Sequence, residues 1–111
     1  MALSDYYSEE NGVERCGCRE VWLEILDAYK DEMEENRVQM LQYFEAGDIK
    51  NFTVTVHSLK SSSRVVGADA LADYAMRLEE YGKAEQADKI KEELDGLSEM
   101  CIEYRKALDE L

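Results

Sequence analysis

The chain contains no proline, one tryptophan and one histidine in 111 residues. Because proline removes a backbone donor and breaks helix interiors, its absence leaves long helices uninterrupted. The sequence also lacks any run of the roughly 18 apolar residues that a membrane-spanning helix needs. About 45% of the residues are apolar, and Glu, Lys, Leu and Ala are frequent. We therefore expect one all-α domain with a single core rather than a β sandwich.

Basic residues are outnumbered, with 13 Lys and Arg against 26 Asp and Glu and a net charge of −13. This charge disfavours nucleic acid and anionic membrane surfaces as partners, because both would repel the protein. The N-terminal residues MALSDYYSEE have neither the basic segment nor the apolar core of a signal peptide. The three cysteines, Cys16, Cys18 and Cys101, form an odd number that is compatible with a reducing compartment. We therefore predict a cytoplasmic protein.

Apolar residues recur every three or four positions along four stretches, a period typical of amphipathic helices. These predicted helices cover residues 19–46, 48–67, 69–82 and about 84–111. Residues 1–18 are polar with scattered aromatics and predict a loop or one short helix. The β-branched run from Thr53 to Val56 could also form a strand, but the chain contains no second strand for it to pair with.

Short connections set the predicted topology. Gly47, Gly67 and Gly82 are expected to end the first three helices, because glycine readily takes the left-handed cap conformation. Asp48 and Asp69 are placed to cap the helices that follow. Connections this short make successive helices antiparallel, so we predict an up-and-down four-helix bundle beyond residue 18. The apolar seam of the last helix could alternatively form an intermolecular coiled coil. The other predicted helices also need partners for their apolar faces, so we expect the four helices to pack within a monomer.

The single histidine, His57, lies in the second predicted helix. Lys60, Ser61 and Arg64 share its face, because positions three, four and seven apart do so on a helix. The apolar residues of this helix fall about 150° to 180° away, so His57 is expected to face solvent. No carboxylate occurs between Asn51 and Ala68, and a basic surface on an acidic protein favours a bound anion. The alternative is a solvated histidine without a role.

Other chemistries fit the sequence less well. A serine hydrolase needs an acid to orient its histidine, and His57 has none on its own helix. The Cys16-Gly17-Cys18 spacing leaves one residue between the cysteines, whereas paired zinc ligands usually have two to four. Cys101 lies in an apolar seam and is expected to be a small buried hydrophobe. We predict no metal site, no cofactor and no enzyme active site.

A resemblance adds to this interpretation. Its residues are His57-Ser58-Leu59-Lys60-Ser61-Ser62-Ser63, Val66-Gly67-Ala68, Leu71, Ala75 and Leu78-Glu79. This pattern resembles the signature of histidine phosphotransfer (HPt) domains, and the similarity extends over about residues 12–108. The resemblance implies a four-helix bundle over residues 19–111 that carries a phosphoryl group and has no turnover of its own.

The resemblance also implies a mechanism. The Nε2 atom of His57 would accept a phosphoryl group from the aspartyl phosphate of a receiver domain and pass it to another receiver. Lys60 would neutralise part of the phosphoryl charge. The receiver, of a response regulator or of a hybrid sensor kinase, would supply Mg²⁺. The alternative function is a helical docking module that binds a receiver or kinase domain without accepting phosphate.

The residues around His57 suggest where a partner would bind. Ser61 and Arg64 depart from the family pattern, in which glycine and small residues are common, and both could contact phosphate or the partner. Val54 and Val65 lie on the side of His57 and are expected to be exposed apolar contacts. Gly67 has two interpretations: a helix cap, or a missing side chain where the partner's surface must fit.

Overall fold

The computed structural model describes residues 2–109 and 111, and these residues include five α-helices and no β-strand. The elements in chain order are the 3₁₀ helix η1 (Leu3–Asp5), α1 (Glu9–Cys16), α2 (Arg19–Glu45), α3 (Ile49–Val65), α4 (Asp69–Lys83) and α5 (Ala87–Leu108). The all-α fold class predicted from the sequence is confirmed. The additional helix, α1, belongs to the segment that was expected to be a loop or one short helix.

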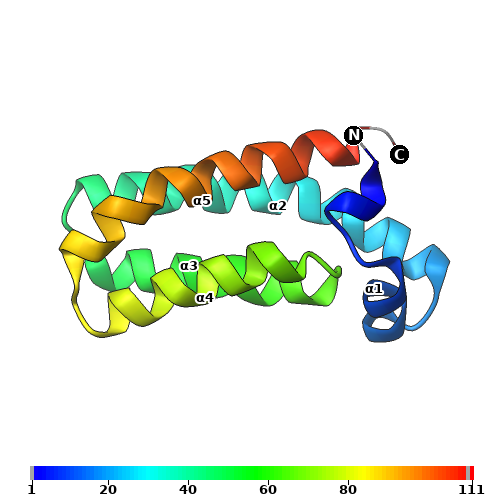
Figure 1. The fold of residues 1–111 in the computed structure, drawn as a ribbon, viewed down its shortest axis with the longest axis horizontal. Coiled ribbons are helices and arrows are strands. Elements are labelled where there is room, and N and C mark those ends of the chain that lie inside the picture. The colour runs from blue at the N-terminus through cyan, green and yellow to red at the C-terminus, as the bar shows by residue number, and fades with distance from the viewer. Residues whose placement is uncertain (1, 110) are drawn as a thin grey trace.

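The four long helices form two layers (Figure 1). Helices α2 and α5 lie side by side above α3 and α4, and each long helix makes its main contacts with two of the other three. Helix α1 lies at one end of the molecule, where it contacts α2 and α3. No helix in the described part of the chain is long and apolar enough to cross a membrane.

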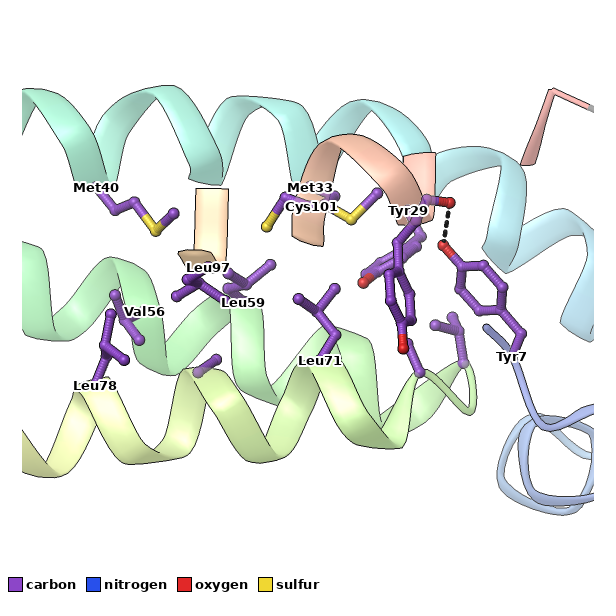
Figure 2. Packing of buried hydrophobic residues seen from close by; sticks show 14 of the residues in the cluster. Tyr7, Tyr29, Met33, Met40, Val56, Leu59, Leu71, Leu78, Leu97 and Cys101 are labelled. Carbon is purple, nitrogen blue, oxygen red and sulfur yellow. Dashed lines mark hydrogen bonds between the residues drawn. The ribbon is translucent and has the colours of Figure 1, made fainter. Parts of the chain in front are cut away.

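The apolar seams of the four long helices meet between these layers (Figure 2). Fully buried side chains in this core include Met33 and Met40 of α2, Val56 and Leu59 of α3, Leu71 and Leu78 of α4, and Leu97 of α5. Burying a side chain of this size contributes about 1.5–3 kcal/mol. The run from Thr53 to Val56 is helical, and it buries Val56 in the core while Val54 stays exposed.

Helix capping followed the prediction at one of two aspartates. Asp48 caps α3, and its side chain accepts a hydrogen bond from the Asn51 backbone at 3.1 Å. The prediction for Asp69 is wrong, because Ala68 occupies the N-cap of α4. The Asp69 carboxylate instead binds two side chains of α1, accepting from Asn11 Nδ2 at 3.0 Å and from Arg15 Nη1 at 2.7 Å. A long-range contact therefore replaces the local cap.

The predicted helix end at Gly82 is also wrong. Helix α4 continues to Lys83, and Glu85 takes the left-handed turn with φ 54°. A Cβ atom at Gly82 would lie 2.1 Å from Thr53 Oγ1. Gly82 therefore allows α4 to approach α3 closely, which is a packing requirement that the local sequence does not reveal. Gly47, with φ 74°, does occupy the turn after α2 as predicted.

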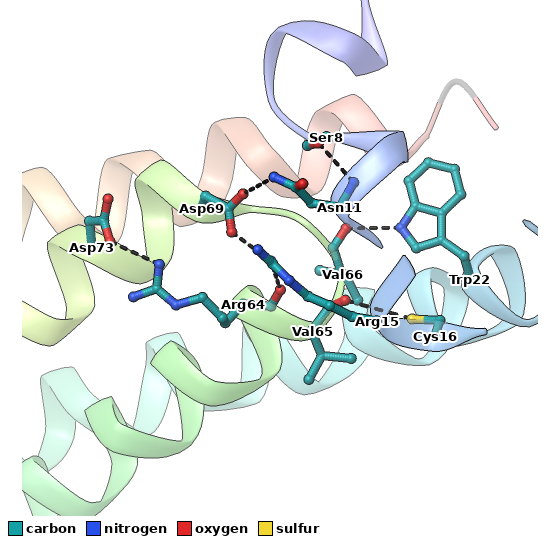
Figure 3. Close-up of polar contacts among 10 residues, drawn as sticks. All are labelled: Ser8, Asn11, Arg15, Cys16, Trp22, Arg64, Val65, Val66, Asp69 and Asp73. Atoms are coloured by element: carbon teal, nitrogen blue, oxygen red, sulfur yellow. Dashed lines mark hydrogen bonds and ion pairs between the residues drawn. The ribbon is translucent and has the colours of Figure 1, made fainter. Parts of the chain in front are cut away.

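The N-terminal segment closes the end of α3 (Figure 3). The Ser8 backbone N–H donates to Gly67 O at 2.9 Å. Trp22 Nε1 donates to Val66 O at 2.9 Å, as Figure 3 shows. The last carbonyls of a helix have no partner within it. The N-terminal segment and the start of α2 therefore supply hydrogen bonds that fix the C-terminal end of α3, the helix that carries His57.

Candidate functional site

His57 lies on the outer side of α3, and its side chain is 57% exposed, which confirms that this histidine faces solvent. Its Nδ1 atom forms a hydrogen bond with Glu79 Oε2 of α4. Glu79 itself is only 3% exposed. An accessible imidazole is thus anchored through one nitrogen to a buried carboxylate of the neighbouring helix.

Both oxygens of the Glu79 carboxylate have partners. Oε1 accepts a hydrogen bond from Lys60 Nζ at 2.6 Å, and Oε2 is shared by His57 and, at 3.8 Å, by Lys83 Nζ. Burial tends to raise the pKa of Glu79, but the hydrogen bonds from Lys60 and His57 outweigh it and hold this pKa below its usual value. Glu79 is therefore an ionised carboxylate at neutral pH.

This hydrogen bond determines the tautomer of a neutral His57. An ionised carboxylate can only accept hydrogen bonds, so the Nδ1 atom that faces it must carry the proton. The lone pair of the neutral imidazole then lies on Nε2. The atom available for nucleophilic attack is consequently Nε2, on a ring whose position is fixed from the other side.

Of the residues predicted to share the face of His57, Lys60 binds the same carboxylate as His57, and both cations of the set have partners. Lys60 is 23% exposed and binds Glu79, as described above. Arg64 Nη1 forms an ion pair with Asp73 Oδ1 of α4 at 2.9 Å (Figure 3). Ser61 is exposed. The basic surface expected from the sequence is therefore partly neutralised by carboxylates of α4.

The two valines are exposed as predicted, at 62% for Val54 and 41% for Val65. Gly67 is buried, and a Cβ atom there would lie 2.3 Å from Ser8 O of the N-terminal segment. With φ 87°, Gly67 follows the end of α3 in the left-handed conformation. The cap interpretation of Gly67 is supported. The prediction that Gly67 contacts a partner is wrong, because the N-terminal segment covers it.

Sequence reasoning assigned no role to Glu79 or Lys83. Glu79 belongs to the motif that resembles HPt domains, but it lies 22 residues from His57 along the chain, and only the pairing of α3 with α4 brings the two together. The position of Glu79 among the apolar residues of α4 could have indicated its role. Glu79 lies four residues after Ala75 and so shares the apolar face of α4, where a lone carboxylate needs a polar partner.

An all-α protein that exposes one histidine, anchored by a buried carboxylate, has the architecture of a histidine phosphotransfer module. The family model described as Hpt domain matches residues 24–111, and the chain belongs to this family. The matched residues begin within α2 and do not include α1.

The chain is 28% identical over 100 residues to "Phosphorelay intermediate protein rdeA" of Dictyostelium discoideum. That alignment covers 84% of this chain and 39% of the relative's length. No solved structure matches the chain significantly.

The lowered pKa of Glu79 predicts how stability depends on pH. A carboxyl group whose pKa is lower in the folded state stabilises the protein above its unfolded pKa, about 4.3 for Glu. That contribution is lost as the pH falls through the folded value. We expect the difference in unfolding free energy between the wild type and Glu79→Gln to shrink as the pH falls from 5 to 2.

Urea unfolding at closely spaced pH values within this range measures the difference. Glu80→Gln, a change at the exposed neighbour, serves as the control and should leave a smaller pH-dependent difference. A wild-type advantage over Glu79→Gln that stays constant down to pH 2 would contradict the prediction.

Proposed function

We propose that this protein is a phosphorelay intermediate. His57 Nε2 accepts a phosphoryl group from the aspartyl phosphate of a receiver domain and passes it to a second receiver. The observation that carries the proposal is the hydrogen bond between His57 Nδ1 and Glu79, which directs the lone pair of an exposed imidazole to Nε2. Membership of the Hpt family supports the same function.

The acceptance step requires no proton transfer. The Nε2 lone pair forms the N–P bond while the P–O bond to the receiver's aspartate breaks, and the aspartate leaves as a carboxylate. The Nδ1 proton stays in place, so the ring becomes a positively charged phosphoimidazolium. Glu79, ionised and 3% exposed, stabilises that charge, much as the aspartate of a protease triad stabilises its imidazolium.

The donation step is the reverse with a second receiver. A carboxylate oxygen of that receiver attacks phosphorus, the N–P bond breaks, and the electron pair returns to Nε2 of the neutral imidazole. Phosphoryl transfer needs mainly alignment and charge neutralisation, which the two helices supply by fixing the ring. Release of the group restores the neutral imidazole, so the chain carries the phosphoryl group from one receiver to the other.

The partners follow from this chemistry. Response-regulator receivers, or the receiver of a hybrid sensor kinase, would bring the aspartate and the Mg²⁺ ion, and the chain would need no cofactor. The docking surface would comprise Val54, Ser61, Arg64 and Val65 around His57. Its support is exposure: Val54 and Val65 are large apolar side chains that solvent reaches, as a transient interface requires.

We also propose that α2, α3, α4 and α5 form the antiparallel up-and-down bundle that the sequence predicted over residues 19–111, as a monomer. Three observations support this arrangement. Consecutive long helices contact each other, α2 and α5 close the set, and each connection is short. Helix α1 is an addition at one end of this bundle.

Transfer from a phosphorylated receiver tests the function. Receivers of the source organism are charged with acetyl phosphate and Mg²⁺ and are then mixed with the wild-type chain. We expect the chain to acquire phosphate that is labile in acid and stable in base, as a phosphoramidate is. A label that survives acid would place the phosphate on a hydroxyl group and contradict the proposal, and so would the absence of label with every receiver.

A further inference from the structure

A surface groove begins one turn after His57, where α3 meets α4. Its lining comprises Arg15, Lys60, Ser61, Arg64, Val65 and Met76. Four of these residues belong to α3, but Arg15 comes from α1 and Met76 from α4. Three helices thus form one surface beside the imidazole, and the sequence indicated a role for neither Arg15 nor Met76.

Arg15 is anchored in this groove (Figure 3). Its Nη1 atom donates to Arg64 O at the end of α3 and, at 2.7 Å, to Asp69 Oδ1 at the start of α4. Both contacts use Nη1, and the side chain is 36% exposed. Since a guanidinium group has five N–H donors in a rigid fork, Nε and Nη2 can still donate to the carboxylate of a partner.

Met76 gives the same groove an exposed apolar wall. It is 38% exposed, and the neighbouring lining residue Val65 is 41% exposed. Methionine is flexible and polarisable, and it is common on surfaces that bind more than one partner. Such a side chain suits a carrier that must dock first with a donor receiver and then with an acceptor receiver.

The position of the groove identifies its occupant. A standard protein interface buries about 800 Å² of each partner, the area of a disc with a radius of about 16 Å. Val65 lies eight residues after His57, which is about 12 Å along the helix axis. A receiver domain that brings its aspartate to His57 therefore covers the groove as well.

We propose that the receiver-docking surface extends from α3 onto α1 and α4, with Arg15 and Met76 as contact residues. This inference rests on the proposed phosphorelay function. Val65 and Met76 pack against an apolar side chain of the receiver, and Arg15 donates to a carboxylate beside it. Both added residues act in docking and take no part in forming the N–P bond at Nε2 of His57.

Two phosphoryl donors separate docking from chemistry. Phosphoramidate needs no docking: Nε2 of His57 attacks its phosphorus, the P–N bond of the reagent breaks, and ammonia leaves, which ³¹P NMR follows. A phosphorylated receiver must dock before transfer. We expect Met76→Gln to raise the half-saturating receiver concentration in single-turnover transfer at least about fivefold, the scale that distinguishes a contact residue from its neighbours. The phosphoramidate rate should stay unchanged.

Ile102→Gln is the matched control for Met76→Gln. Ile102 lies on α5, is 37% exposed and does not line the groove. This variant should transfer like the wild type with both donors. Equal unfolding midpoints are expected for the two variants and the wild type, because both side chains are partly in solvent.

A second set of variants tests Arg15. Arg15→Gln should also raise the half-saturating receiver concentration, and Arg15→Lys should recover only part of the loss, because lysine keeps the charge without the fork. Arg19→Gln removes another ion-paired arginine, which binds Glu9, and controls for net charge. Met76→Gln is the decisive variant, since loss of Arg15 also removes the bonds to Arg64 O and Asp69.

The outcomes separate this inference from the function on which it rests. If the wild type accepts phosphate and Met76→Gln has the same half-saturating concentration as Ile102→Gln, the phosphorelay function stands and the extended docking surface is rejected. An equal slowing of Met76→Gln with both donors would also overturn the docking role. If the wild type accepts no phosphate on His57 from any receiver, both proposals fail.

Discussion

Replacement of His57 by Gln is expected to abolish phosphate incorporation. The chain has one histidine, so the variant contains no imidazole that could form a phosphoramidate. The fold should persist, because the side chain is 57% exposed and Gln can still donate a hydrogen bond to Glu79. Incubation of both proteins with a phosphorylated receiver, followed by measurement of acid-labile label, makes the comparison.

Ser61→Ala is the matched control for this experiment. Ser61 lies one turn from His57 on α3 and is exposed, so it is the nearest exposed hydroxyl that could carry a misassigned phosphate. Because Ser61 belongs to the proposed docking surface, Ser61→Ala is expected at most to slow transfer, and the label that it acquires should still be acid-labile. Acid-labile label in the His57→Gln variant at the wild-type level would refute the proposed function, provided that circular dichroism shows unchanged helicity. Binding of a receiver by His57→Gln, with no transfer to the wild type, would instead favour the docking module.

Trp22→Ala is expected to cause the largest loss of stability. Trp22 is fully buried, and its Nε1 atom donates to Val66 O at the end of α3. The indole also lies against Gly12 of α1, where a Cβ atom would be 2.1 Å from Nε1. Truncating a buried Trp costs about 3–5 kcal/mol, a large part of the roughly 5–15 kcal/mol that stabilises a typical domain. Urea unfolding monitored by circular dichroism measures the loss.

Two companion variants identify the source of this loss. Trp22→Phe keeps much of the apolar area but removes the hydrogen bond to Val66 O, and it should cost less than Trp22→Ala. Val21→Ala changes the adjacent residue, which is 38% exposed, and should stay within about 0.5 kcal/mol of the wild type if it acts as an ordinary surface position. If Trp22→Ala were no more destabilising than Val21→Ala, the docking of α1 and α2 on the end of α3 would be refuted.

The long helices could be predicted because each one has an apolar seam with a helical period. Tyr29, Met33 and Met40 of α2 and Leu94, Leu97 and Cys101 of α5 are buried, at positions three, four or seven apart along each helix. Asp48 followed its local rule as well, since its capping partner is only three residues away. Such features depend on neighbours within one or two helical turns, which the sequence displays directly.

The wrong predictions involve residues that respond to another helix. Asp69 has the residue type of a cap, yet Arg15 and Asn11 of α1 bind its carboxylate. Gly82 has the residue type of a helix end, yet it lies within α4, where Thr53 of α3 packs against it. In both cases the residue type suits the predicted role, but a contact with a distant part of the chain determines the role that the residue actually has.

The sequence by itself determined that this protein is helical, which faces of its helices are apolar, and that His57 points to solvent, because a helical period of 3.6 residues fixes those directions. Only the tertiary structure decided what surrounds the imidazole. Packing of α3 against α4 buries Glu79 beside His57, ties Lys60 to that carboxylate and leaves Lys83 in solvent. The nucleophilic nitrogen follows from this hydrogen bond, whose partners lie 22 residues apart in the chain and meet only across two helices.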